Sequence, residues 1–223
     1  PNKNIRELAG HPLMAYSIAA ALESGIFDRV TVSSDSEKYL EVALRYGADC
    51  HFEKIVGDRY DYKWIDQVLN RNWDYRLNRP EYFAILRPTS PFRSVETIRR
   101  CFTEWNWDKY DSIRAVEPVS QHPGKMWVVR EKTMYPLLPA GPVDPPWHSS
   151  PTQNLPQVYI QNASLEMASL EAFNRTKTIS GWKIQAFFTD SLEGYDLNSE
   201  YDWEIAKKLI RDGVATLPEV LNG

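Results

Sequence analysis

Two short stretches of the 223-residue chain carry side chains suited to a phosphate group and its metal ion. Lys3 and Asn4 stand shortly before a predicted helix, where a mobile positive charge, directional donors and the helix N-terminus can together bind phosphate. Asp196 and Asn198 precede another predicted helix, and oxygen ligands of this kind suit the hard cation Mg²⁺. Each stretch alone has a plainer interpretation, because a terminal lysine is usually solvated and an aspartate before a helix is often a turn residue.

The turn Arg87-Pro88-Thr89-Ser90-Pro91 is a third candidate, because it follows a run of apolar residues at 82–86. Such a run is typical of a strand buried on both faces, so we expect 82–86 to lie at the centre of a sheet. Ligands of parallel α/β sheets bind at the carboxyl ends of the strands. The turn is therefore expected to lie near the ligand.

Hydrophobic periodicity and capping residues predict the elements that position these stretches. Helices are expected at 12–24, 36–46, 62–73, 95–105 and 202–211, with Gly25 and Gly47 ending the first two and with Asp35 and Ser94 as N-caps of the second and fourth. Strands are expected at 29–33, 48–52, 82–86, 112–116 and 183–189. The repeated alternation of strand and helix predicts an α/β fold with a parallel sheet.

The alternation breaks at residue 121, so we divide the chain into an α/β nucleotide-binding catalytic domain, 1–120 with 176–223, and a β-rich insertion, 121–175. Within the insertion, strands are expected near 126–129, 135–138, 158–161 and 165–169. Seven of the chain's fifteen prolines lie between Pro136 and Pro156. Because proline-rich segments are stiff, this loop could reach into a neighbouring subunit.

Composition excludes several classes of function. The 26 basic and 30 acidic residues are interspersed and leave a formal charge of −4, so a nucleic-acid polymer is not an expected partner. No apolar run reaches the roughly 20 residues of a membrane span, and no signal-like start is present, so we expect a cytoplasmic protein. The two cysteines and four histidines are scattered, which argues against a zinc site.

Several segments resemble, in their order and spacing, one family, the bacterial acylneuraminate cytidylyltransferases, which are similar to CMP-sialic acid synthetases. The resemblance rests on Pro-Asn-Lys-Asn with Leu-Ala-Gly-His-Pro-Leu at 1–13, Val-Ser-Ser-Asp-Ser at 32–36, Leu-Arg-Pro-Thr-Ser-Pro-Phe-Arg at 86–93 and Tyr-Asp-Leu-Asn at 195–198. Segments 121–127 and 157–163 also look like the middle region of that family. The resemblance covers nearly the whole chain.

This resemblance implies a Rossmann-like nucleotidyltransferase fold, a three-layer sandwich with a mainly parallel sheet and a β-rich dimerisation insertion. The implied reaction transfers CMP from CTP to the anomeric hydroxyl of an acidic nine-carbon sugar for bacterial surface glycans, with Mg²⁺ as cofactor and a homodimer as the assembly. Lys3 and Asp196 would be catalytic. The nucleotide would contact Lys3, Asn4, Ser34, Pro88, Thr89 and Ser90, the sugar Arg87, Lys125, Gln161 and Asn162, and the metal Asp196 and Asn198.

Three positions depart from the family pattern. Asn198 stands where a second aspartate is usual, so a single metal ion or weaker metal binding is an alternative. Arg87 replaces a glutamine, and it either pairs with a carboxylate or phosphate of the substrates or has a structural ion-pair role. Thr152 stands where some relatives carry a sugar-binding arginine, so a sugar other than ordinary sialic acid is an alternative within the sialic, legionaminic or pseudaminic types.

Two other functions stay open at this stage. One is a related nucleotidyltransferase acting on an eight-carbon ulosonic acid or another sugar, and the other is a catalytically silent nucleotide-binding module. The first residues read as the end of a loop, so we expect a strand and a phosphate-binding loop upstream of Pro1.

Overall fold

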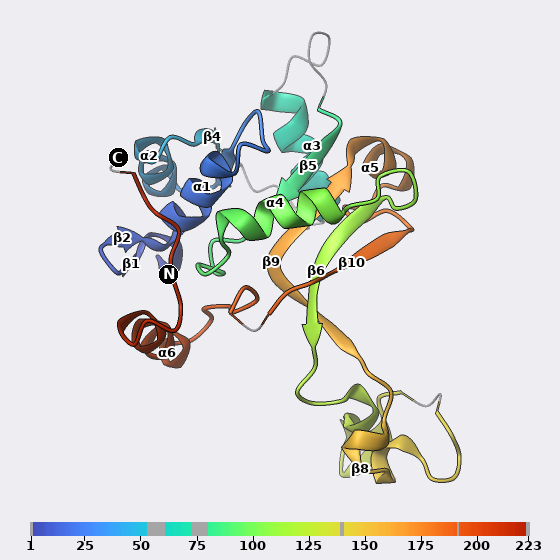
Figure 1. Ribbon diagram of the computed structural model, residues 1–223. Helices are drawn as coiled ribbons and strands as arrows, with labels where there is room; N and C mark the ends of the chain where they lie inside the picture. The colour runs from blue at the N-terminus through green and yellow to red at the C-terminus, as the bar shows by residue number, and fades with distance from the viewer. Residues whose placement is uncertain (1, 53–60, 73–79, 139–140, 191, 222–223) are drawn as a thin grey trace.

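The computed structural model describes residues 2–52, 61–72, 80–138, 141–190 and 192–221 (Figure 1). Pro1, the end of the helix predicted at 62–73 and part of the proline-rich loop, 139–140, lie outside the described residues. Among the described residues, no helix combines the length and apolar character needed to cross a membrane.

A four-stranded mixed sheet forms the centre of the body. Its strands are β5 (Tyr82–Ile85), β6 (Ser112–Pro118), β9 (Tyr159–Ser169) and β10 (Ile184–Phe188), in the order β10-β6-β9-β5. β10 and β6 are parallel, whereas β9 runs antiparallel to both β6 and β5. A separate parallel pair consists of β3 (Thr31–Ser34) and β4 (Asp49–Phe52).

Helices pack on both faces of the four-stranded sheet. The α-helices of the described residues are α1 (Leu13–Ser24), α2 (Glu37–Arg45), α3 (Asp61–Asn72), α4 (Val95–Glu104), α5 (Leu170–Thr176) and α6 (Glu200–Arg211). Along β5, Tyr82 and Ala84 pack toward α1 and α4, while Phe83 and Ile85 pack toward α3 and α5. Because side chains of a strand alternate between its two faces, this division shows the three layers of the predicted α/β class.

The run at 82–86 is covered on both faces, as predicted, but its expected place at the centre of a sheet is wrong for the described residues. β5 is the end strand of its sheet, because β9 pairs with only one of its edges. Its other edge borders a largely apolar cavity of about 340 Å³ whose opposite wall includes Val30, Val32 and other residues of the β3 region. The apolar character of β5 therefore reflects two covering helical layers and this cavity.

The local capping predictions are confirmed with one exception. Gly25 ends α1 with φ 66°, a left-handed conformation that glycine adopts without strain. Ser94 Oγ caps α4 by accepting a hydrogen bond from the Thr97 amide, and the Thr97 hydroxyl in turn accepts one from the Ser94 amide. Asp35 is not the N-cap of α2, because the helix begins one residue later and Ser36 occupies that position.

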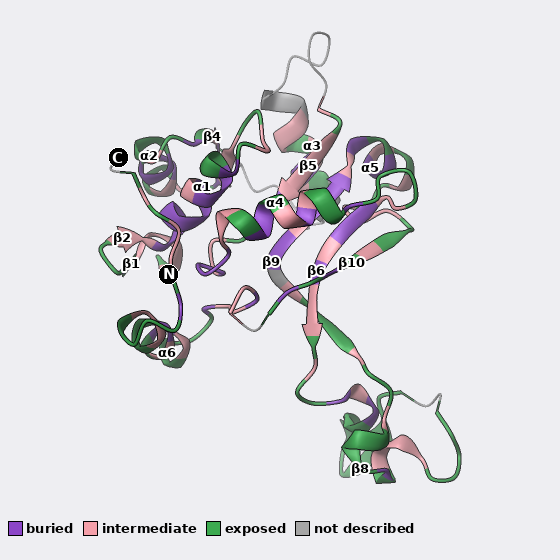
Figure 2. Cartoon of the chain, viewed as in Figure 1, coloured by how far each residue is buried: buried purple, intermediate pink, exposed green. Residues whose placement is uncertain are grey.

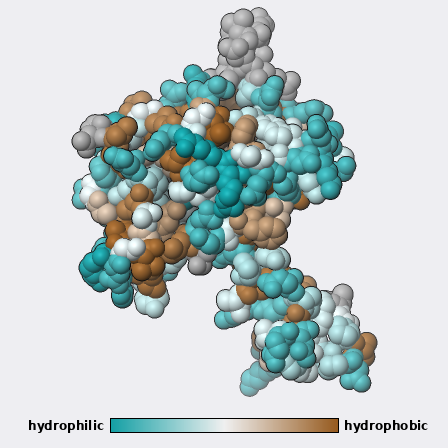
Figure 3. Space-filling view, in the orientation of Figure 1, coloured by the Kyte–Doolittle hydropathy of each residue, from teal (hydrophilic) through white to brown (hydrophobic). Residues whose placement is uncertain are grey.

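A slender arm projects from the body on the ends of β6 and β9 (Figures 1 and 3). It contains β7 (Trp127–Arg130), β8 (Thr133–Pro136) and the 3₁₀ turns η2 (Pro123–Lys125), η3 (Trp147–Ser149) and η4 (Thr152–Asn154). Every residue of β7 and β8 is exposed (Figure 2). The strands predicted at 158–161 and 165–169 form one strand, β9. The C-terminal half of β9 pairs with β5 and β6 in the body. This half of β9, and the helix α5 that follows it, therefore belong to the α/β layers, although both lie within the 121–175 segment.

The remaining short elements lie at the N-terminal end of the chain. They are a 3₁₀ turn, η1 (Lys3–Ile5), and a two-stranded hairpin of β1 (Glu7–Leu8) and β2 (His11–Pro12). Leu8 and Leu13 pack with Trp203 and Ala206 of α6. This cluster brings the first residues of the chain next to its last helix.

Candidate functional site

Lys3, Asn198 and Asp196 form a continuous hydrogen-bonded chain. Lys3 Nζ donates to Asn198 Oδ1 at 3.1 Å, and Asn198 Nδ2 donates to Asp196 Oδ2 at 2.6 Å. The two predicted phosphate and metal stretches therefore meet, although they lie at opposite ends of the chain. A cationic amine beside a carboxylate at a surface is an arrangement that can hold phosphate and a divalent cation together.

The segment that carries Asp196 is fixed on both sides. The Leu197 amide donates to the Thr89 carbonyl at 2.9 Å, and the Leu197 side chain is fully buried among residues of α1 and α6. On the other side, Asp202 Oδ2 accepts hydrogen bonds from the amides of Asn198 and Ser199 at 2.9 and 2.7 Å. These backbone hydrogen bonds lower the pKa of Asp202, which stands in the first turn of α6, where a negative charge favours the helix dipole.

Three of the predicted residues hold buried polar atoms that have no hydrogen-bond partner in the described part of the protein. These atoms are Asn4 Oδ1, Ser90 Oγ and Asp196 Oδ1. Buried polar groups in folded proteins are nearly always paired, so an unpaired group at a surface site is a place where a ligand or ion can supply the partner. By contrast, Ser34 Oγ is already used locally, because it accepts from the Ser36 amide at 3.1 Å.

A second, smaller cavity of about 130 Å³ brings together three of the four predicted sugar-contacting residues. Arg87, Gln161 and Asn162 line it, with Leu165 and Glu166. Glu166 pairs with Arg114 and lies 4.0 Å from the Arg87 guanidinium. Two guanidinium groups thus share one carboxylate, which leaves positive charge available for a carboxylate-bearing ligand.

Lys125 is placed elsewhere by the structure. It is an exposed residue of η2, in the arm, and is not among the residues that line the cavity. Within one chain, the structure therefore does not bring Lys125 together with Arg87, Gln161 and Asn162.

Two residues of this region were not predicted from the sequence. Arg93 is fully buried, and it donates to the Arg87 carbonyl at 3.3 Å, to Ser17 Oγ at 2.7 Å and to the Ser164 carbonyl. Burial lowers the pKa of Arg93 to about 9. Glu166 is the other, and a single acidic residue in a strand of mixed composition carries no sequence signal.

The residues near Asp196 fit one metal-ligand position better than two. The described residues contain no group of three or more acidic, histidine or cysteine side chains that could hold a metal ion, so a bound ion would take most ligands from phosphates and water. Asp196 Oδ1 has no hydrogen-bond partner among the described residues, whereas Asn198 directs its amide nitrogen at Asp196 and its oxygen at Lys3. The geometry therefore suits Asp196 as a metal ligand and leaves Asn198 as the link between Asp196 and Lys3.

Comparisons with known proteins find similarity to cytidylyltransferases. Residues 1–56 match the family model described as cytidylyltransferase. An N-acylneuraminate cytidylyltransferase of Escherichia coli is 32% identical over 92% of this chain and 47% of its own length. A pseudaminic acid cytidylyltransferase of Campylobacter jejuni is 53% identical over 108 residues, which are 47% of each protein. The matches thus span about half the length of these two curated relatives.

A solved structure confirms the fold class. CMP:2-keto-3-deoxy-manno-octonic acid synthetase, complexed with CTP, matches with a TM-score of 0.66 over 96% of this chain and 93% of that chain. The sequences are 11% identical, so this likeness bears on the α/β fold alone.

Proposed function

From the premise that this chain is a homologue of the acylneuraminate cytidylyltransferases, we propose that it transfers CMP from CTP to the anomeric hydroxyl of a nonulosonic acid. The observation that carries this proposal is the contact of Lys3 with Asn198, and through it with Asp196. It joins the first and last motifs of the sequence into one site, beside the Pro88–Ser90 turn that Leu197 contacts through Thr89.

In the proposed reaction, the anomeric oxygen attacks the α-phosphorus of CTP and the bond from that phosphorus to the bridging oxygen breaks. Pyrophosphate leaves with the electron pair, and the hydroxyl proton passes to solvent. Lys3 would neutralise the phosphates, while Asn4 and Ser90 would orient the nucleotide through their unpaired oxygens. Mg²⁺, held by Asp196, would supply charge neutralisation at the phosphates.

The acid would bind in the cavity lined by Arg87, Gln161 and Asn162. Its carboxylate is matched by Arg87, whose side chain is 48% exposed and whose guanidinium lies 4.0 Å from Glu166, and so can exchange that partner for the substrate. This gives Arg87 a substrate role in preference to the purely structural one.

We further propose a homodimer in which the arm of one subunit contacts the other. Trp127, Val129, Met134 and Tyr135 expose apolar surface on β7 and β8, and exposed patches of this kind are typical of protein interfaces. In such an assembly, Lys125 of one subunit would contact the acidic sugar bound in the cavity of the other subunit. The proposed compartment is the cytoplasm, where free thiols such as Cys50 and Cys101 stay reduced.

Pyrophosphate release tests the reaction. The protein, and a version extended upstream of Pro1, would be incubated with CTP, Mg²⁺ and a panel containing N-acetylneuraminic, legionaminic, pseudaminic and eight-carbon ulosonic acids. We expect release with one or more nine-carbon acids and formation of the corresponding CMP sugar. Preference for the eight-carbon acid would reassign the substrate, and CTP binding without release by either version would indicate a silent nucleotide-binding module.

A further inference from the structure

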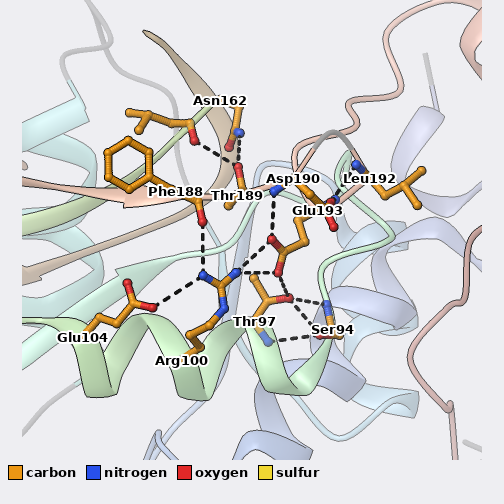
Figure 4. Close-up of polar contacts among 11 residues, drawn as sticks. Ser94, Thr97, Arg100, Glu104, Asn162, Phe188, Thr189, Asp190, Leu192 and Glu193 are labelled. Carbon is orange, nitrogen blue, oxygen red and sulfur yellow. Dashed lines mark hydrogen bonds and ion pairs between the residues drawn. The ribbon is translucent and has the colours of Figure 1, made fainter. Parts of the chain in front are cut away.

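An acidic side chain outside the sequence motifs fastens the loop that carries Asp196. This loop, 189–198, connects β10 to α6, and Glu193 lies near its middle (Figure 4). Arg100 Nη2 donates to both carboxylate oxygens of Glu193, at 2.8 and 2.9 Å, and Thr97 Oγ1 donates to one of them at 2.7 Å. Both donors stand on α4, whose capping box fixes Thr97.

The same carboxylate also orders the loop itself. Glu193 Oε2 accepts from the Asp190 amide at 3.0 Å, and Asp190 Oδ1 accepts from the amides of Leu192 and Glu193 at 2.8 and 2.7 Å. Arg100 additionally donates to the Phe188 carbonyl at 3.1 Å, at the end of β10. The guanidinium therefore holds the middle of the loop through Nη2 and the end of β10 through Nη1, and its hydrogen bonds to the Glu193 carboxylate are charge-assisted.

The next residue, Gly194, places this loop against the acid cavity. It is buried, and a Cβ atom at this position would overlap Glu117 Oε2 and lie 2.5 Å from Asn162 Nδ2. Asn162 in turn donates to Glu117 Oε2 at 3.1 Å. It also donates to Thr189 Oγ1 at 2.7 Å (Figure 4). The absence of a side chain at Gly194 thus allows the loop to lie beside a cavity residue.

We propose that Glu193 and Gly194 are positioning residues that fix the Asp196 carboxylate relative to the acid cavity. Glu193 locks the loop to α4, and Gly194 allows the close approach to Asn162. The inference rests on the proposed function, because it assumes that Asp196 and Asn162 act in one reaction. Neither residue touches the substrates, so each acts through the residue that it holds.

The first test compares Glu193→Gln with Glu104→Gln. Glutamine keeps the size of Glu193 but weakens its charge-assisted bonds, whereas Glu104, 3.6 Å from Arg100 Nη1, is a carboxylate on the same guanidinium that does not contact the loop. Mn²⁺ binding in the presence of CTP would be followed by electron paramagnetic resonance. We expect Glu193→Gln to weaken Mn²⁺ binding and lower kcat by about 10-fold or more, as for other residues that support a metal ligand, and Glu104→Gln to change neither.

If Glu193→Gln lowers the melting temperature so far that its kinetics are uninterpretable, Arg100→Lys serves in its place, because lysine keeps the charge but has one amine where arginine uses two nitrogens to reach Glu193 and the Phe188 carbonyl. Hydrogen exchange of the Gly194–Asn198 amides gives a readout that needs no activity. Faster exchange in Glu193→Gln than in Glu104→Gln supports the role of Glu193 in holding the loop. Equal exchange with unchanged Mn²⁺ binding overturns that role. If the wild-type protein is inactive but the two variants still differ in exchange, the proposed reaction is rejected, whereas the role of Glu193 in holding the loop is retained.

The second test is Gly194→Ala. The added methyl group would displace the Glu117 carboxylate and the Asn162 amide, so we expect a KM for the acid raised by about 10-fold, with the KM for CTP unchanged and the melting temperature close to that of the wild type. An unchanged KM for the acid would overturn the role of Gly194.

Discussion

Asp196 is the residue on which the proposed chemistry depends most directly. Its Oδ2 accepts from Asn198, and its Oδ1 is buried without a partner among the described residues. Asp196→Asn would replace the negative charge by a neutral amide of similar size and would leave the backbone contact of Leu197 with Thr89 in place. The expected result is a fall in Mg²⁺-dependent pyrophosphate release of about 100-fold or more, with the melting temperature little changed.

The matched control for this substitution is Asp212→Asn. Asp212 follows α6 and pairs with Lys208 at the surface, outside the Asp196 segment. Steady-state pyrophosphate release with varied Mg²⁺ would measure both variants. Full activity of Asp196→Asn, or an equal loss in Asp212→Asn, would remove Asp196 from the metal site.

A second residue-scale prediction concerns alkaline pH. Burial raises the pKa of the Cys101 thiol to about 12, above its ordinary value of 9.0, because the thiolate is poorly solvated in the core beneath α4. The folded state therefore binds this proton more tightly than the unfolded state, so the contribution to stability is complete below pH 9 and is lost as the pH rises toward 12. Within that window, the group should lower the free energy of unfolding by up to about 1.4 kcal/mol per pH unit.

Urea unfolding of the wild type and of Cys101→Ala at several pH values would measure this contribution. The variant lacks the thiol, so its stability should fall less steeply above pH 9, while other alkaline groups such as Tyr16 act on both proteins alike. Identical pH dependence in the two proteins would show that the thiol titrates normally in the folded state.

At the scale of elements, the β7–β8 hairpin exposes apolar side chains that no other part of the described chain covers. Val129, on β7, is 60% exposed, and so is Leu44 on α2 of the body. We expect Val129→Asp to shift the protein from dimer to monomer in analytical ultracentrifugation, because a carboxylate would have to be desolvated in the proposed interface. Leu44→Asp, at equal exposure, should stay dimeric, and a wild-type protein that is already monomeric would exclude the dimer.

The same scale shows what the sequence could and could not reveal. Helices α1, α4 and α6 were predicted within one or two residues, since caps and apolar periodicity are local signals. The apolar run of β5 correctly indicated covered faces, yet its place at the end of the sheet depends on β9, which arrives about eighty residues later in the chain. The helix α5 was not predicted, because its seven residues follow directly from β9 without a break.

For the candidate site, the motifs identified the residues but not all of their partners. The contact of Lys3 with Asn198 and the shared cavity of Arg87 and Asn162 follow the predicted grouping. Glu193 and Glu166 escaped prediction, because a single acidic residue in a loop or strand has no sequence signal until the fold brings a guanidinium to it. The assignment of residues to substrate contacts stays a prediction, and the proposed variants test it.

At the scale of the whole molecule, the body and the arm are built on different principles. The body buries apolar side chains between helical layers and a sheet, whereas the arm exposes most of the residues that it carries (Figure 2). The two are joined by β6 and β9, which keep pairing beyond a register shift between Arg114 and Val116. In the space-filling view the arm is a separate lobe on a narrow neck (Figure 3).

This two-strand neck has a consequence for how such a protein can diverge. Residues beyond the neck share few packing constraints with the layers that hold Asp196, so substitutions and length changes there leave the body's core intact. The inner halves of β6 and β9, by contrast, are bound to the core through Ile113 and Met167 and have little freedom to vary. Lineages can therefore acquire new subunit contacts in one part of the gene while retaining an inherited chemistry in the other.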